Sequence, residues 1–238
     1  MKRLISLLVV LAAVPANGEE KPLPETLKKM LLPFKEELVS AVVAQVKGVV
    51  VAVDEAFALQ NENTAPDAPF TIIVPTGKNL IFLPGGKKTG TTELIQLSTA
   101  APDKHCIESL RLASLSVPMQ PDPADRLKLC AETLKTQALT LATKDYKDVR
   151  LVETYATKIG GYEAVCLHAQ MTKATGERYV LKLAGILHPT QKGGVLASLM
   201  ADTKLSEIKR PEDLSSKGLG LVILHSIKFV EAKTVAKP

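Results

Sequence analysis

YEAVCLHAQMTKATGERYVLKLAGIL, residues 162–187, contains two largely apolar runs separated by the turn residues Lys-Ala-Thr-Gly. Two such runs joined by a short loop that ends in glycine predict a β-hairpin, with strands at residues 162–172 and 177–187. Side chains alternate between the two faces of a strand, so Cys166 and His168 are expected on the same face. This hairpin is the starting point for the rest of the fold.

Further strand candidates lie on both sides of the hairpin. A helix is predicted between them, because Asp122 is a favourable N-cap and Pro123 a favourable first helical residue. Its apolar residues recur at steps of three and four as far as residue 143. Strands separated by one long helix indicate an α+β fold, an antiparallel sheet covered by helices. The strands are expected at residues 70–74, 80–83, 91–97, 106–117, 149–158 and 195–201, with a short helix at 211–214 and an extended segment at 227–229.

The N-terminal part of the chain has a different pattern. Apolar residues recur every three or four positions over residues 19–60, which predicts a helical N-terminal extension. Residues 48–59 also fit a strand, since their apolar side chains alternate, and the pattern leaves both open. Residues 61–69 are polar and rich in proline, as expected of a linker. The main domain is then residues 70–230, followed by a tail at 231–238.

The first 18 residues have the pattern of a secretory signal peptide. Lys2 and Arg3 precede an apolar run at residues 4–14, and small residues follow at Ala16 and Gly18. Cleavage is expected after Gly18. The apolar run is shorter than the roughly 20 residues of a membrane helix, so no integral membrane span is expected after cleavage. These features predict a bacterial protein that is periplasmic or secreted.

Charge and composition exclude one class of function. The 238 residues have 30 Lys and Arg against 25 Asp and Glu, a formal charge of +5. Two of the cations leave with the signal peptide, so the mature chain carries +3, from 28 basic and 25 acidic residues. The cations are dispersed and aromatic residues make up 4% of the chain, so nucleic-acid binding is not expected.

Several short strings resemble the PsbP/DcrB-like superfamily. Residues 70–77, FTIIVPTG, are similar to the opening strand of that family, and Gly161-Tyr162-Glu163-Ala164 is similar to a later strand start. The string HSIKF at residues 225–229 resembles the end of the family domain. The resemblance covers roughly residues 69–229. It implies an α/β/α sandwich used mainly as a binding or accessory module, and it provides no shared catalytic residue.

The cysteine and histidine residues are the candidates for chemistry. In an oxidising compartment, one disulfide is possible among Cys106, Cys130 and Cys166, and buried free thiols are the alternative. Cys166 and His168, together with His105 or Cys106, have the ligand types that bind zinc or copper.

No catalytic motif was found, so we expect a protein that is not an enzyme and needs no cofactor. The leading hypothesis is an exported, non-catalytic binding or accessory protein that acts through protein–protein or small-ligand binding. Its expected partner is a protein of the cell envelope. The alternative is a periplasmic metal- or thiol-dependent protein that uses Cys166 and His168 with Cys106 or His105.

Overall fold

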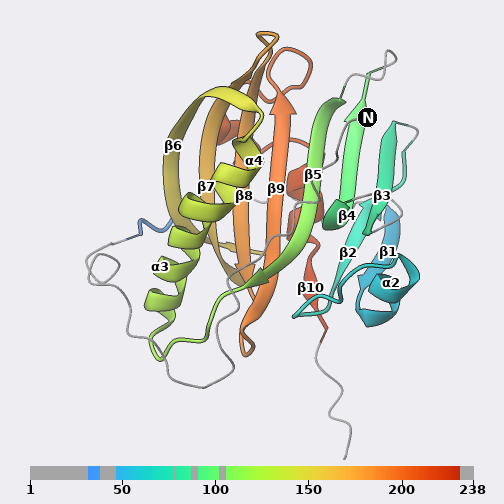
Figure 1. Cartoon of the computed structure of the whole chain (residues 1–238), viewed down its shortest axis with the longest axis vertical. Helices are drawn as coiled ribbons and strands as arrows, with labels where there is room; N and C mark the ends of the chain where they lie inside the picture. Colours follow the sequence, from blue (N-terminus) through green and yellow to red (C-terminus); the bar gives the residue numbers. More distant parts are fainter. Residues whose placement is uncertain (1–31, 38–46, 78, 87–90, 102–105, 231–238) are drawn as a thin grey trace, which may run out of the picture.

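The computed structural model describes residues 32–37, 47–77, 79–86, 91–101 and 106–230. The expected signal peptide and tail lie outside these residues. The largest element is an antiparallel seven-stranded sheet of order β3-β4-β5-β9-β8-β7-β6 (Figure 1). Its strands are β3 (Leu80–Gly86), β4 (Thr91–Ala100), β5 (Cys106–Ser116), β6 (Tyr146–Ile159), β7 (Tyr162–Lys173), β8 (Arg178–Leu187) and β9 (Gly193–Asp202). The hairpin predicted from residues 162–187 is the pair β7–β8.

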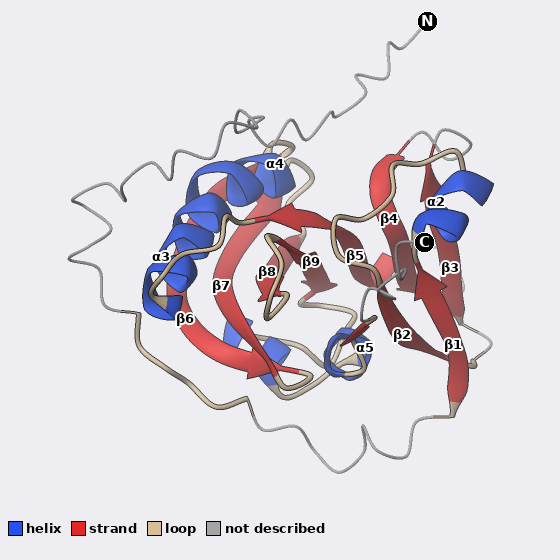
Figure 2. Cartoon of the chain, turned by 90° about the horizontal axis from the view of Figure 1, so that it is seen from below, coloured by secondary structure: helices blue, strands red, loops and turns tan. Residues whose placement is uncertain are grey.

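One face of this sheet packs against a second layer of mixed structure. A three-stranded sheet of β1 (Gly48–Val53), β2 (Phe70–Pro75) and β10 (Lys228–Phe229) belongs to it. So do the 3₁₀ helix η3 (Pro211–Ser215) and helix α5 (Leu219–His225), and Figure 2 shows α5 close to β2. The core here contains Phe70 and Ile72 from β2, Cys166 from β7 and Leu224 from α5.

The opposite face is covered by one long helical segment. It consists of α3 (Pro123–Thr133), a π-helical turn η2 (Leu134–Ala138) and α4 (Leu139–Thr143). The side chain of Asp122 accepts a hydrogen bond from Ala124 N, so the predicted N-cap is confirmed. A second core lies beneath this segment and includes Val165, Leu167 and Leu183. The α+β class and the sandwich of helices and sheet are therefore confirmed.

Arg126 and Gly185 fix where the helical segment lies. The buried guanidinium of Arg126 donates to the carbonyl oxygens of His188 and Gln191, each at 2.6 Å, and so joins α3 to the turn between β8 and β9. Gly185 of β8 lies directly beneath α3. A Cβ at this position would be 2.5 Å from Cys130 Sγ, closer than atoms can approach. The absence of a side chain therefore allows the helix to pack closely on the sheet.

The N-terminal region differs from the predicted helical extension. Residues 48–53 form strand β1, which pairs with β2 and buries Val53, and helix α2 (Glu55–Gln60) follows. The two alternatives for residues 48–59 thus each hold for part of the segment. Residues 48–53 form a strand because they pair with β2. This is a tertiary contact, and the spacing of apolar residues in the sequence does not reveal it. Residues 32–37 are also extended, and residues 19–31 and 38–46 lie outside the described residues.

The expected linker is packed against the domain. Ala68 is fully buried, and the side-chain amide of Asn63 donates to the carbonyl oxygen of Glu93 in β4 at 2.9 Å. Residues 61–69 therefore connect α2 to β2 along a fixed path.

Gly185→Ala is expected to lower the free energy of unfolding by about 1–3 kcal/mol, because the new methyl group forces α3 away from the sheet. Chemical denaturation measures this loss. Adding Cys130→Ala to the Gly185→Ala variant removes the clashing sulfur and should restore part of the lost free energy of unfolding. Gly77→Ala is the matched control, since a Cβ there meets no atom within 4 Å. Equal stability of the Gly185→Ala and Gly77→Ala variants would contradict this account of the packing.

Candidate functional site

A group of polar side chains is buried between the main sheet and the second layer. We call it the buried polar cluster and define it as Glu37, Tyr155, His168, Lys182, Ser215 and His225. Three strands build its floor in register, because Glu153 of β6 is opposite His168 of β7, which is opposite Lys182 of β8. Tyr155 and Cys166 form the next row on the same face, two residues along each strand. The ends of η3 and α5 add Ser215 and His225.

Glu37 enters this cluster from the N-terminal segment, residues 32–37. The segment lies along edge strand β6, where Lys35 N donates to Ala156 O and Ala156 N donates to Pro33 O, both at 2.9 Å. Glu37 then turns inward and is buried. Its Oε1 accepts hydrogen bonds from Lys182 Nζ and from Tyr155 OH at 3.0 Å. Its Oε2 lies 3.2 Å from His225 Nε2.

The ionisation of Glu37 follows from these contacts. Burial alone would raise its pKa, but the hydrogen bond with His225 and the charge of Lys182 outweigh that effect and lower the pKa to about 2. His225 acts as the donor in this arrangement. Gly160 N donates to His225 Nδ1 at 3.4 Å, so the ring proton is on Nε2, which faces the carboxylate. Glu37 and Lys182 thus form a buried, fully partnered ion pair.

His168 connects the carboxylates of Glu153 and Glu37 through a chain of hydrogen bonds, in which Tyr155 OH is the link to Glu37. Its Nδ1 is 3.0 Å from Glu153 Oε1, and its Nε2 is 3.3 Å from both Ser215 Oγ and Tyr155 OH. The order Ser215–His168–Glu153 resembles the hydrogen-bond chain of a serine hydrolase. Burial and the charge of Lys182 lower the pKa of His168 to about 4, which makes it a weak base. Ser215 Oγ is also held by Tyr155 OH at 2.8 Å. The geometry therefore describes a closed network and not an activated nucleophile.

The structure locates the predicted metal ligands in different places. Cys166 and His168 lie on one face of β7, and Cys166 Sγ is 3.4 Å from Glu37 Oε1. Cys106 begins β5, with Arg111 and Glu108 as its charged neighbours, and His105 lies outside the described residues. Across the described part of the chain, no three His, Cys, Asp or Glu side chains are grouped to hold a metal ion. The ammonium of Lys182 also makes the surroundings of Cys166 unfavourable for a cation.

The three cysteines are free thiols. Cys130 packs in the core under α3, whereas Cys166 packs in the core on the opposite face of the sheet. Burial raises the pKa of Cys130 to about 12 and raises the pKa values of Cys166 and Cys106 as well. Cys130 and Cys166 therefore have the burial and the weak acidity of packing residues, whereas Cys106 is half-buried.

Most of the cluster was not anticipated from the sequence. Lys182 gave the clearest available signal, because it is a lone cation in the apolar strand YVLKLAGIL. A charged residue inside such a strand requires a buried partner, although its identity cannot be inferred locally. Glu37 lies 145 residues away in the chain and has no distinguishing local pattern.

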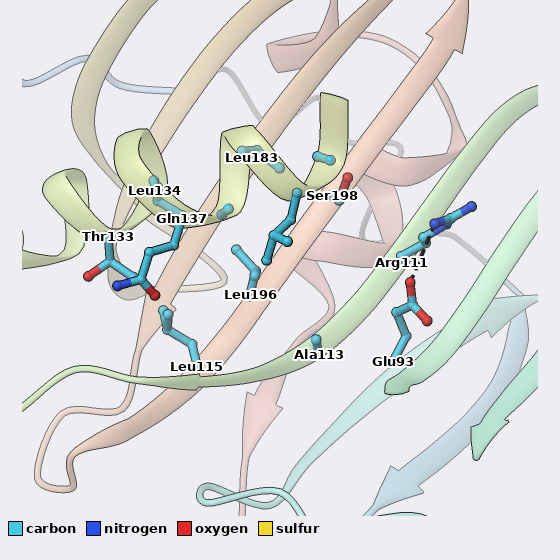
Figure 3. A pocket seen from close by; sticks show the side chains of 13 residues that line it. Glu93, Arg111, Ala113, Leu115, Thr133, Leu134, Gln137, Leu183, Leu196 and Ser198 are labelled. Carbon is cyan, nitrogen blue, oxygen red and sulfur yellow. Dashed lines mark hydrogen bonds and ion pairs between the residues drawn. The ribbon is translucent and has the colours of Figure 1, made fainter. Parts of the chain in front are cut away.

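An apolar pocket lies on the other face of the sheet, beside the helical segment (Figure 3). Its volume is about 110 Å³. Leucine and alanine side chains from the helices and strands line its interior, and Arg111, Glu93 and Gln137 lie at its margin. The apolar lining residues are Ala113, Leu115, Leu134, Ala138, Leu141, Ala142, Leu183 and Leu196.

The pocket is bordered by an unusual helical turn. Leu134, Gln137 and Ala138 all belong to η2, where the helix is π-helical. Single π-turns within α-helices often occur at functional sites, because the widened turn repositions its side chains. The pocket is therefore the second candidate site, and it differs from the buried polar cluster in face and in chemistry.

No protein-family model and no curated protein matches the sequence. Solved structures do resemble the chain. Cyanobacterial PsbP from Synechocystis sp. PCC 6803 is 10% identical, with a TM-score of 0.46, and the match covers 77% of this chain and 94% of that one. LpqN of Mycobacterium tuberculosis, involved in cell envelope biogenesis, is 15% identical, with a TM-score of 0.43 and coverage of 80% and 96%.

The Ran-binding protein Mog1p of Saccharomyces cerevisiae is 11% identical, with a TM-score of 0.41 and coverage of 76% and 96%. The likeness of these structures to the chain is partial, and the PsbP-like resemblance of the strings quoted from the sequence stays a prediction. The likeness concerns the fold alone. Among the described residues, no helix is both long enough and apolar enough to cross a membrane.

His168 is expected to remain neutral until the pH approaches 4, instead of protonating near its ordinary value of 6.5. The unfolded chain binds this proton at higher pH than the folded chain does. The free energy of unfolding should therefore rise with pH between about 4 and 6.5 and fall as the solution is acidified. NMR titration of the imidazole resonances measures the midpoint directly. A midpoint near 6.5, or an unchanged pH slope in His168→Asn, would contradict this prediction.

Proposed function

We propose that this chain is an exported, non-catalytic binding protein that holds the apolar part of a small amphipathic ligand in the pocket beside η2 and α4. The observation that carries the proposal is the composition of the pocket. Its interior is formed largely by leucine and alanine side chains, whereas Figure 3 shows Arg111 and Glu93 at one end and Thr133 and Gln137 at the other. Such an arrangement favours a ligand with an apolar group and a polar head.

The polar margin suggests how the head group is held. Arg111 Nη1 lies 3.4 Å from Glu93 Oε1, and both side chains retain solvent exposure (Figure 3). Exposed ion pairs of this kind contribute little stability, so Arg111 is available to an anionic group at small energetic cost. Gln137 lies on the helical side, at the other end of the pocket from Arg111 (Figure 3), and has both a donor and an acceptor.

The sheet continues beyond the pocket, and none of the described helices covers β5, β4 and β3 on this face (Figure 1). Ser198 of β9, Arg111 of β5, Gln96 of β4 and Leu83 of β3 are successive cross-strand neighbours on this face. Leu83 is 42% exposed, and Ile81 of the same strand is 46% exposed. A protein partner in the cell envelope would contact these exposed apolar side chains of β3, next to the bound ligand. We therefore propose this face as the side through which ligand or partner approaches.

The first test measures binding of dansyl-labelled undecanoic acid to the full chain. Ala142→Phe introduces a ring into the pocket and should weaken binding by roughly tenfold, equivalent to about 1.4 kcal/mol. The ring fills space that is already apolar, so thermal stability should not fall. Fluorescence titration and a thermal melt measure the two effects separately.

Thr140→Phe is the matched control, because Thr140 is exposed on the same helix and does not line the pocket. It should leave the affinity unchanged. Arg111→Gln should weaken binding of the labelled acid more than binding of the corresponding labelled alcohol, because the substitution removes the positive charge that meets the acid. Equal affinity of the wild type, Ala142→Phe and Thr140→Phe for the acid would refute the proposed ligand site.

A further inference from the structure

The N-terminal segment, residues 32–37, has one buried residue, Glu37 at its end, while Leu32 at its start packs partly buried against the core beneath the helical segment. Pro33, Phe34, Lys35 and Glu36 are exposed, and the ring of Phe34 is 64% accessible to solvent. Two backbone hydrogen bonds and the exposed ion pair of Lys35 with Glu153 hold these residues on β6. Glu37, by contrast, is buried and makes all the contacts of its carboxylate inside the cluster. The segment thus resembles a short ligand with one anchoring group.

The cluster without Glu37 has the charge of a receptor for an anion. Lys182 is 0% exposed and carries a positive charge, while Tyr155 and Cys166 are neutral, because burial raises the pKa of each. His225 presents its Nε2–H, and Glu153 contacts Nδ1 of His168, on the far side of the His168 ring. An isolated buried charge is strongly unfavourable, so an anion at the position of the Glu37 carboxylate is strongly favoured.

The arrangement of donors selects a carboxylate among anions. Lys182 and Tyr155 both donate to one oxygen of Glu37, and His225 donates to the other. Donors on two sides of a planar group with two oxygens satisfy a carboxylate fully. The N–H and C=O groups of β6 at Ala156 add a backbone site that an extended peptide uses in the same way as residues 33–35.

We propose that the buried polar cluster is a carboxylate-binding site which the chain's own Glu37 occupies, and that an external carboxylate binds there when residues 32–37 leave the edge of β6. The external group is either a small free carboxylate or an acidic side chain on an extended peptide. Both present the same two oxygens to Lys182, Tyr155 and His225. The site is separate from the apolar pocket, so either assignment stands without the other.

The test uses full-length Glu37→Ala. Thermal stability is measured in sodium acetate and in sodium chloride at equal ionic strength. Binding is measured for the capped peptide Leu-Pro-Phe-Lys-Glu-Glu, which copies residues 32–37, and for the same peptide with Gln as its last residue. We expect acetate to raise the melting temperature, or the Glu peptide to bind at least tenfold more tightly than the Gln peptide. The first result identifies a free carboxylate as sufficient, and the second identifies an extended peptide.

Two variants separate this result from a general effect of charge. Glu36→Ala removes the exposed neighbouring carboxylate and keeps Glu37. Its melting temperature in acetate and its binding of the Glu peptide should therefore equal those of the wild type. Glu37→Ala combined with Lys182→Met removes the buried charge together with its partner, and should fold without responding to acetate or to the Glu peptide. A response of that double variant equal to the response of Glu37→Ala would overturn the proposal.

The wild type gives a measurement that does not depend on the folding of Glu37→Ala. The amide of Lys35 donates to Ala156 O, so its hydrogen exchange reports whether the segment is bound. An excess of the Glu peptide or of acetate should accelerate that exchange, and the Gln peptide or chloride should not. If no carboxylate accelerates the exchange and none stabilises Glu37→Ala, then Glu37 is a structural ion-pair partner and the proposed site does not exist.

Discussion

The ammonium group of Lys182 is a positive charge in the interior of the protein, and much of the chain is arranged around it. Its direct partners are Glu37 and Ser215, and Tyr155 and His225 complete the coordination of the Glu37 carboxylate. The burial of such a pair is costly unless every remaining donor and acceptor is satisfied. This requirement explains why the N-terminal segment, the edge of the sheet and the two C-terminal helical turns converge at one point.

The pleat of the sheet separates two kinds of chemistry that are neighbours in sequence. On β8, Lys182 faces the polar cluster and Leu183 lines the apolar pocket. On β7, Cys166 and His168 face the polar side, whereas Val165 and Leu167 pack beneath the helical segment. Because adjacent side chains point to opposite faces, one strand can support an ionic network and an apolar cavity without mixing them. The two candidate sites are therefore only one residue apart in the chain.

The local signals in the sequence predicted the fold well. The hairpin of β7 and β8, the cap at Asp122 and the approximate positions of the strands all depend on residues close together in the chain, and they agree with the structure. The candidate sites depend on contacts over long separations. His225 meets Glu37 across 188 residues, and the strand at residues 48–53 is fixed by pairing with β2. Periodicity cannot detect such contacts, so the emphasis on cysteine and histidine missed Lys182 and Glu37.

The position of Glu37 in the chain also has a consequence for how the molecule folds. A ribosome makes residues 32–37 before any of their partners, and the most distant of these, His225, follows 188 residues later. The segment has no complete docking site until β6, β7, β8 and α5 have been made. Lys182 therefore gains its carboxylate partner only when the segment docks on these later elements. The earliest described residues to be synthesised thus depend for their place on elements that are made after them.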